Sequence, residues 1–127
     1  MRRAVDTSAW IELFDDSPIG RRVRREIAEL DGIIVPTIVQ LELAVWMTRE
    51  VSEAISDEMI AFTNQCIVVQ LDTRLAMNAA EVRRQHRLAT ADAIIYATAL
   101  AHNADLLTCD AHFRDLPGVV YFAKTGE

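Results

Sequence analysis

Short runs of β-branched and other apolar residues alternate with longer helical patterns along most of the chain, and this alternation constrains the fold more than any other feature. We predict strands at residues 3–5, 33–35, 67–71, 106–108 and 119–122. The second and the last of these follow turn residues, Asp31-Gly32 and Pro117-Gly118. Strands that alternate with helices form parallel sheets covered on both faces. The sequence therefore predicts a three-layer α/β/α fold with a central parallel sheet and Rossmann-like topology.

The helical segments carry start signals of the expected kinds. We expect helices over residues 8–14, from Pro36 in a first turn to about Arg49, from Ser52 onward, from a cap at Asp72 or Thr73 to His86, and over residues 91–102 with Thr90 as N-cap. In a doubly wound sheet, sites form at the carboxyl ends of the strands, where the chain leaves for the next helix. Functional residues are therefore sought at those ends.

Length and composition favour one domain over residues 1–127. A chain of 127 residues can bury roughly 65 to 70% of its unfolded surface, which suffices for one core but not for two. Half of the residues (51%) are apolar, and there are only four glycines and three prolines, so the chain does not resemble a disordered one.

Neither a membrane nor a secretory role is expected. The longest helix-like apolar stretch, residues 93–101, is far shorter than the ~20 residues needed to span a bilayer. Asp6 interrupts the start before an apolar leader develops. Cys66 and Cys109 form no metal-binding or redox pattern, so we interpret them as small hydrophobic residues of a reduced compartment. We expect a cytoplasmic protein.

The charge of the chain limits how it can meet nucleic acid. A net charge of −6 argues against binding by bulk positive charge, so any contact with nucleic acid must be local. All basic residues except Lys124 are arginines, which suit bidentate phosphate contacts as well as surface ion pairs.

Two arginine clusters allow either interpretation. The first comprises Arg21, Arg22, Arg24 and Arg25. Its spacing predicts the (i, i+4) pairs Arg22–Glu26 and Arg25–Glu29, which favour a solvated helix face over an RNA grip. The second comprises Arg83, Arg84, His86 and Arg87. It precedes Asp92 closely enough to border a cleft and meet RNA phosphates or the acids of a protein partner, although His86 is expected to be only a polar helix-end residue.

Four acids stand where a site is expected. Asp6 follows the first predicted strand and Asp110 the fourth, although helix capping and turn chemistry are ordinary roles for such residues. The helical neighbours of Glu42 are all apolar (Ile38, Val39, Val45 and Trp46), so its carboxylate needs a partner, a metal or a wet cleft. Asp92 also has apolar neighbours, but it lies in a first turn, where the helix dipole favours an anion.

Together these acids predict a metal site. No cationic residue is regularly spaced to neutralise them, and unpaired carboxylates that converge repel one another. Oxygen ligands with no Cys or His among them select Mg²⁺ or Mn²⁺ over zinc. Such ions typically serve phosphoryl transfer, often as pairs roughly 3.5 to 4 Å apart. The residues themselves thus suggest metal-dependent phosphodiester hydrolysis.

Four strings in register resemble the PIN-domain ribonucleases, specifically the VapC-like toxins of toxin–antitoxin pairs. They are VDTSAWIEL at residues 5–13, VPTIVQLEL at 35–43, TADAIIYATAL at 90–100 and LLTCDAHF at 106–113. By motif position, the resemblance implies that Asp6, Glu42, Asp92 and Asp110 are catalytic and bind Mg²⁺ or Mn²⁺. It further implies orienting roles for Ser8 and Thr108, a homodimer, and an endoribonuclease toxin that a cognate VapB-like antitoxin neutralises. Separately, the closeness of Arg83, Arg84 and Arg87 to Asp92 in the sequence makes them candidates for contact with RNA or with the antitoxin.

Several alternatives stay open at this point. Asp115 rivals Asp110 as the fourth acid, but it lies outside the T-x-D-x-x-F string, and Asp105 has only a turn role. Trp10 and Trp46 are expected to anchor the core or an interface. A catalytically silent PIN-type binding module is one rival function. Another is a receiver-type Mg²⁺-binding signalling domain. It is disfavoured because such domains carry adjacent acids after the first strand and a lysine after a late strand, whereas this sequence has a single acid at Asp6 and its only lysine at Lys124.

Overall fold

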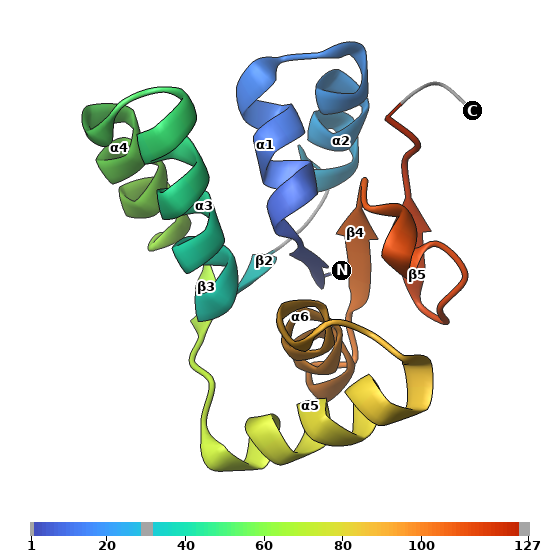
Figure 1. Ribbon diagram of the computed structural model, residues 1–127. Helices are drawn as coiled ribbons and strands as arrows, with labels where there is room; N and C mark the ends of the chain where they lie inside the picture. The colour runs from blue at the N-terminus through green and yellow to red at the C-terminus, as the bar shows by residue number, and fades with distance from the viewer. Residues whose placement is uncertain (1, 29–31, 125–127) are drawn as a thin grey trace.

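A computed structural model describes residues 2–28 and 32–124, and within them five parallel strands form a single sheet (Figure 1). The strands are β1 (Arg2–Val5), β2 (Gly32–Pro36), β3 (Ile67–Val69), β4 (Asp105–Thr108) and β5 (Val119–Tyr121). Their order is β3-β2-β1-β4-β5, and every neighbouring pair is parallel. The predicted fold class and the positions of all five strands are confirmed.

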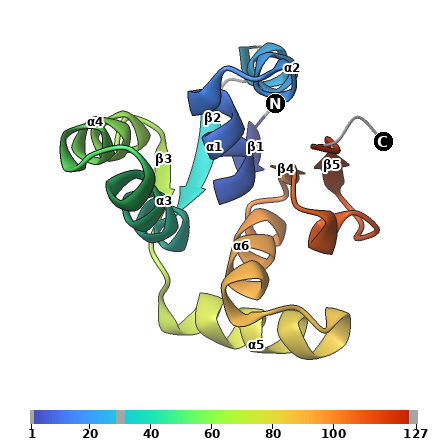
Figure 2. The same ribbon diagram turned by 45° about the horizontal axis from the view of Figure 1, so that its top comes forward.

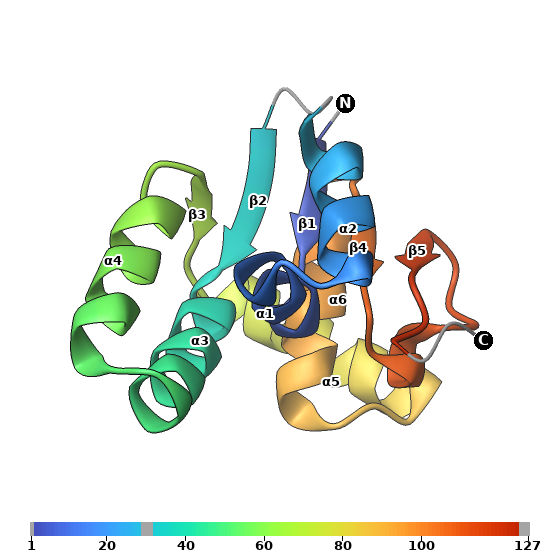
Figure 3. The same ribbon diagram turned by 90° about the horizontal axis from the view of Figure 1, so that it is seen from above.

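Helices cover both faces of this sheet. They are α1 (Thr7–Asp15), α2 (Pro18–Ala28), α3 (Thr37–Glu50), α4 (Glu53–Thr63), α5 (Thr73–His86) and α6 (Thr90–Ala101), with a short 3₁₀ helix η1 (Ala111–Phe113) after β4. Helices α1 and α2 lie on one side of the strands, and α5 and α6 lie on the other (Figure 2). The α3–α4 pair lies beside the β3 edge (Figure 3). The sheet is thus the middle of three layers.

Side-chain caps fix where several helices begin. Asp6, Ser52 and Asp72 each accept a hydrogen bond from the backbone N–H three residues later and thereby satisfy a donor that the helix leaves free. The cap predicted at Thr90 is wrong: Ala89 is the N-cap and makes no side-chain cap bond. Leu88 is buried immediately before it, so packing rather than a cap sets this helix start.

Two other predicted boundaries near β2 and β3 are also wrong, for one shared reason. Pro36 does not occupy a first helical turn, because its extended backbone still pairs with Val69 in the sheet. Strand β3 correspondingly ends at Val69 and not at residue 71, since β2 gives way to α3 beyond Pro36. Parallel pairing extends only as far as both strands do.

In the core, the alanine-rich helix α6 packs on the middle strands of the sheet. Residues Ala4 and Val5 of β1 and Leu106 and Leu107 of β4 are fully buried. Helix α6 packs on β1, β2 and β4, and its alanines allow close approach to the sheet. Trp10 is buried in this core, as predicted, whereas Trp46 is half-buried. Because β1 and β4 are adjacent and parallel, their carboxyl ends deliver Asp6 and Asp110 to the same edge.

None of the helices in the described residues is long and apolar enough to cross a bilayer.

Gly20 supports the contact between α1 and α2 that holds the first helical layer. A Cβ at this position would lie 2.0 Å from the carbonyl oxygen of Glu12 in α1. We predict that Gly20→Ala lowers the free energy of unfolding by about 1 to 3 kcal/mol, because overpacking against backbone outweighs the better helix propensity of alanine. Urea unfolding, with exposed Arg21→Ala as control, measures this. An unchanged or higher stability of Gly20→Ala would contradict the packing described.

Candidate metal centre

Asp6 is a buried carboxylate at the carboxyl end of the central strand. Its side chain is 3% exposed. Oδ1 accepts hydrogen bonds from the hydroxyl of Ser8 (2.7 Å) and the backbone N–H of Ala9 (3.1 Å), and Oδ2 accepts one from the hydroxyl of Thr108 (2.6 Å). Asp6 therefore caps α1 and also contacts the two flanking hydroxyls, as predicted. These three hydrogen bonds fix the orientation of the carboxylate and leave one lone pair of Oδ2 without a partner among them.

The hydroxyls of Ser8 and Thr108 connect Asp6 to the loop that carries Asp110. Ser8 Oγ accepts a hydrogen bond from the N–H of Cys109 (3.0 Å), and Thr108 Oγ1 accepts one from the N–H of Asp110 (2.9 Å). Ser8 thus does not cap the helix, because Asp6 does. Thr108 is fully buried and joins the ends of β1 and β4 through one side chain. A direct role in orienting substrate stays a prediction for both residues.

Asp110 and Asp92 approach each other at this edge, together with a histidine. His112 Nδ1 lies 3.0 Å from Asp110 Oδ1 and 3.8 Å from Asp92 Oδ2. One donor atom from each of the three residues fits within a 4.8 Å cluster. A histidine that the sequence analysis did not include among the candidate ligands therefore lies beside two of the acids. The position of His112, two residues after Asp110, is the sequence feature that could have identified it as a candidate.

Glu42 reaches the same edge from α3. Its Oε1 accepts a 2.6 Å hydrogen bond from the hydroxyl of Thr7, the first residue of α1. Thr7 is therefore the partner that the apolar surroundings of Glu42 required, and the sequence analysis did not identify it. The contact turns Glu42 toward the junction of β1 and α1, next to Asp6.

The carboxylates perturb one another. Burial, together with the smaller effect of the Asp110 charge, raises the pKa of Asp6 to about 6 against the lowering effect of its hydrogen bonds. The pKa of Asp92 is also raised, first by burial and then by Asp110 and Glu42, while His112 opposes the shift. Asp110 is thus close enough to act on Asp6 and Asp92, and Glu42 close enough to act on Asp92. Electrostatic effects therefore connect the four acids through Asp110 and Asp92, while the donor cluster within 4.8 Å comprises Asp92, Asp110 and His112.

Comparison with known proteins agrees with this arrangement of strands and helices. The sequence profile of the PIN domain matches residues 3–119. The chain belongs to the PIN domain family. The alternative of a receiver-type signalling domain is therefore wrong. No match is found among curated protein sequences.

Solved structures share the fold of this PIN domain. A toxin–antitoxin complex from Klebsiella pneumoniae has a chain that matches with a TM-score of 0.78 at 23% identity, covering 93% of this chain and 95% of that one. VapC20 of Mycobacterium tuberculosis, described as a sarcin–ricin loop cleaving toxin, matches at 0.78 and 17%, covering 94% and 97%. VapBC-1 from nontypeable Haemophilus influenzae matches at 0.75 and 18%, covering 98% and 99%. At these identities the likeness concerns the fold.

The donor set of this PIN domain fits a divalent cation. Its acids lie close together at one edge, and neither Asp6 nor Asp92 has an arginine or lysine among its hydrogen-bond or ion-pair partners within residues 2–28 and 32–124. Carboxylate oxygens at helix starts and strand ends, with one imidazole nearby, are ligands that hard or borderline divalent ions accept.

The arginines near the site are not equivalent. Arg87, in a left-handed conformation after α5, lines a pocket of about 230 Å³ together with Asp92, His112 and His86. Arg84 instead pairs with Glu81 on the exposed face of α5. Arg83 lines a separate apolar pocket with Leu71 and Ile94, among others. Of the three arginines predicted to contact RNA or antitoxin, the structure brings Arg87 to the acids.

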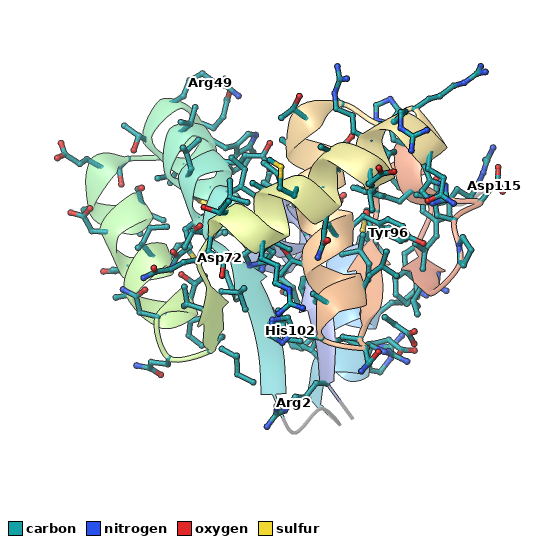
Figure 4. The ribbon with its side chains drawn as sticks, turned by 90° about the horizontal axis from the view of Figure 1, so that it is seen from below. Arg2, Arg49, Asp72, Tyr96, His102 and Asp115 are labelled. Atoms are coloured by element: carbon teal, nitrogen blue, oxygen red, sulfur yellow. The ribbon has the colours of Figure 1, made fainter. Side chains whose placement is uncertain are left out.

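Asp115 lies apart from the acids. Its side chain is 92% exposed and 3.9 Å from Arg114, and it lies at the periphery of the molecule (Figure 4). It therefore provides a matched control for Asp110 and Asp92.

The first arginine cluster is on a solvated helix face, but not through the predicted pairs. Glu26 pairs with Arg3 (2.5 Å), whose side chain is only 14% exposed and gains more from a carboxylate than an exposed arginine does. The predicted Arg22–Glu26 pair is therefore wrong, and the guanidinium of Arg22 lies 4.8 Å from the ring centre of Phe122. The predicted Arg25–Glu29 pair lies outside the described residues.

The raised pKa of Asp6 predicts a pH-dependent stability of the metal-free protein. Because the folded-state pKa of Asp6 is about 6 and its ordinary value 3.8, its favourable contribution is complete below pH 3.8 and is lost as the pH rises to about 6 and above. This loss corresponds to roughly 3 kcal/mol. An Asp6→Asn variant has no ionisable group at this position and so lacks this pH-dependent loss. Its free energy of unfolding relative to that of wild type should therefore increase by up to about 3 kcal/mol between pH 4 and 7.

Denaturant unfolding in the presence of chelator measures this difference, with Asp115→Asn as the control that should show no such trend. The contrary outcome is a stability of Asp6→Asn relative to wild type that stays constant with pH or decreases as the pH rises. Either result would show that ionisation of Asp6 does not destabilise the folded protein.

Proposed function

We propose that this PIN domain is a metal-dependent endoribonuclease toxin that cleaves RNA phosphodiester bonds and is neutralised by a cognate VapB-like antitoxin. The observation that carries the proposal is the convergence of Asp6, Glu42, Asp92 and Asp110 at one sheet edge, where Asp6 is buried with a raised pKa. PIN domain membership and the likeness of the fold to toxin structures support it.

In this proposal the four acids hold Mg²⁺ or Mn²⁺. The bound ion would lower the pKa of an attacking water and offset charge on the phosphate and the leaving oxygen. Asp6 holds its position because Ser8, Ala9 and Thr108 donate hydrogen bonds to its oxygens, of which Oδ2 accepts only one of the three. Thr7 fixes the rotamer of Glu42 through their hydrogen bond. Asp92 and Asp110 are half-buried and keep oxygen atoms accessible from the solvent side.

RNA binding in this proposal depends on local groups. Arg87 borders the pocket beside Asp92 and can bind a phosphate next to the scissile one. Such contacts suit a chain with a net charge of −6, because one exposed RNA segment needs only a few cationic partners and the metal. The cytoplasm, where RNA is abundant, is the expected compartment.

The antitoxin is proposed to cover the acidic edge, with a basic side chain as the natural counterpart of unpaired carboxylates. The structures that share its fold include a toxin–antitoxin complex from Klebsiella pneumoniae and VapBC-1 from Haemophilus influenzae, which supports a partner of this kind. A homodimer is also expected from the family resemblance. A catalytically silent binding module is the competing function, and activity measurements separate the two.

Removal of one acid should abolish cleavage. We predict that Asp92→Asn lowers the rate of RNA cleavage by at least about 100-fold, since loss of a few kcal/mol of transition-state stabilisation has this effect. The assay uses purified, antitoxin-free protein and total RNA, with Mg²⁺ or Mn²⁺ and with chelator. Asp115→Asn should cleave like wild type.

Cleavage that persists in Asp92→Asn or in chelator would contradict metal-dependent hydrolysis. Absence of cleavage by the wild-type protein, together with tight binding of a partner, would instead favour the silent binding module.

Arg84, on the last turn of α5, and Arg87, immediately after this helix, should differ in their effect on substrate binding. We predict that Arg87→Ala raises the KM for RNA by about 5- to 10-fold, because one charge-assisted phosphate contact is typically worth ~1 kcal/mol or more. Arg84→Ala should leave the KM close to that of wild type, because Arg84 pairs with Glu81 on the solvent side. Equal effects of the two substitutions would place the RNA elsewhere.

A further inference from the structure

His112 is directed at the acids by the turn that follows β4. Asp110 caps η1 by accepting a 2.9 Å hydrogen bond from the backbone N–H of His112. This bond fixes the main chain of His112 immediately beside Asp110. The imidazole then projects so that Nδ1 faces Asp110 at 3.0 Å and Asp92 at 3.8 Å.

Nothing in the core requires this placement. The side chain of His112 is 77% exposed, so it is not packed against apolar neighbours that would dictate its rotamer. Both ion-pair partners of the imidazole in the described residues are proposed metal ligands. Neither His86 nor His102 belongs to the three-residue donor cluster.

We propose that His112 is a direct nitrogen ligand of the divalent cation at this site, and that it makes the site prefer Mn²⁺ over Mg²⁺. The inference rests on the proposed metal centre and specifies its ligands and its ion. Asp92, Asp110 and His112 offer one donor atom each within 4.8 Å of one another, a spacing that small side-chain rotations convert into a shared coordination sphere.

The preference follows from ligand chemistry. Mg²⁺ favours oxygen ligands and retains its waters, so an imidazole contributes little to its binding. Affinity for nitrogen-containing sites increases along the first transition series from Mn²⁺ onward. A site of carboxylates alone would not discriminate in this way. The nitrogen of His112 is therefore the group that distinguishes the two ions.

Metal binding to the full-length, metal-stripped protein tests the inference without reference to activity. Calorimetric titration with Mn²⁺ and with Mg²⁺ is performed on wild type, His112→Gln, His86→Gln and His102→Gln. His86 is the near control, because it lines the same pocket, and His102 is the remote one, at the far end of α6 (Figure 4). Pulsed electron paramagnetic resonance of the Mn²⁺-loaded proteins detects a coordinated nitrogen directly.

We expect a nitrogen coupling in wild type and both control variants, and its loss in His112→Gln. Loss of groups that merely support a ligand weakens metal binding by roughly 10- to 100-fold, so loss of the ligand itself should weaken Mn²⁺ binding by at least about 10-fold. The Mg²⁺ affinity should change by less than about threefold. The exposure of His112 means that the substitution leaves the core intact.

Two results would overturn the inference while the metal centre stands. One is Mn²⁺ that binds without a nitrogen coupling in wild type but is lost in Asp92→Asn, which would reduce His112 to a hydrogen-bond partner of Asp110. The other is a coupling that persists in His112→Gln. Failure of wild type to bind either cation would refute the metal centre itself, and the role of His112 with it.

Discussion

The buried carboxylate of Asp6 is the constraint on which the rest of the site depends. An ionisable group at the end of the central strand, 3% exposed, is costly unless its oxygens are satisfied. Thr108, Ser8 and the start of α1 satisfy them. The same hydroxyls hold the N–H groups of Cys109 and Asp110. The position of the β4–η1 loop therefore follows from how Asp6 is stabilised.

The acidic edge lowers the stability of the metal-free protein. Burial raises the pKa values of Asp6 and Asp92, and their neighbouring acids raise them further. A fold selected for stability alone would place an apolar residue or an arginine there. The unfavourable electrostatics of the metal-free protein are what a bound cation would relieve, so the same interactions that destabilise the domain support the proposed function.

Local patterns were sufficient to predict most of the fold. The β-branched runs identified five strands within a few residues, and Ser52 and Asp72 capped the expected helices. Errors occurred where tertiary contacts decide a boundary. Ala89, and not Thr90, is the N-cap of α6, because buried Leu88 fixes where this helix begins. Strand β3 ends before the predicted residue 71, because its partner strand ends at Pro36.

The four acids could be identified from the sequence because each lies at a strand end or on an apolar helical face. Their partners could not. Thr7 and Glu42 are 35 residues apart, and Arg3 and Glu26 are 23 apart, so no short-range periodicity connects either pair. His112 was missed for a different reason: its approach to the acids depends on the backbone hydrogen bond to Asp110, which no sequence pattern shows.

The central claim is that the acidic edge between β1 and β4 is a divalent cation site. A crystal of the protein soaked in Mn²⁺ and measured at a wavelength where manganese scatters anomalously tests it most directly. We expect an anomalous peak within coordination distance of carboxylate oxygens of Asp6, Asp92 and Asp110. Full occupancy of Mn²⁺ elsewhere on the molecule, with no peak among these acids, would contradict it.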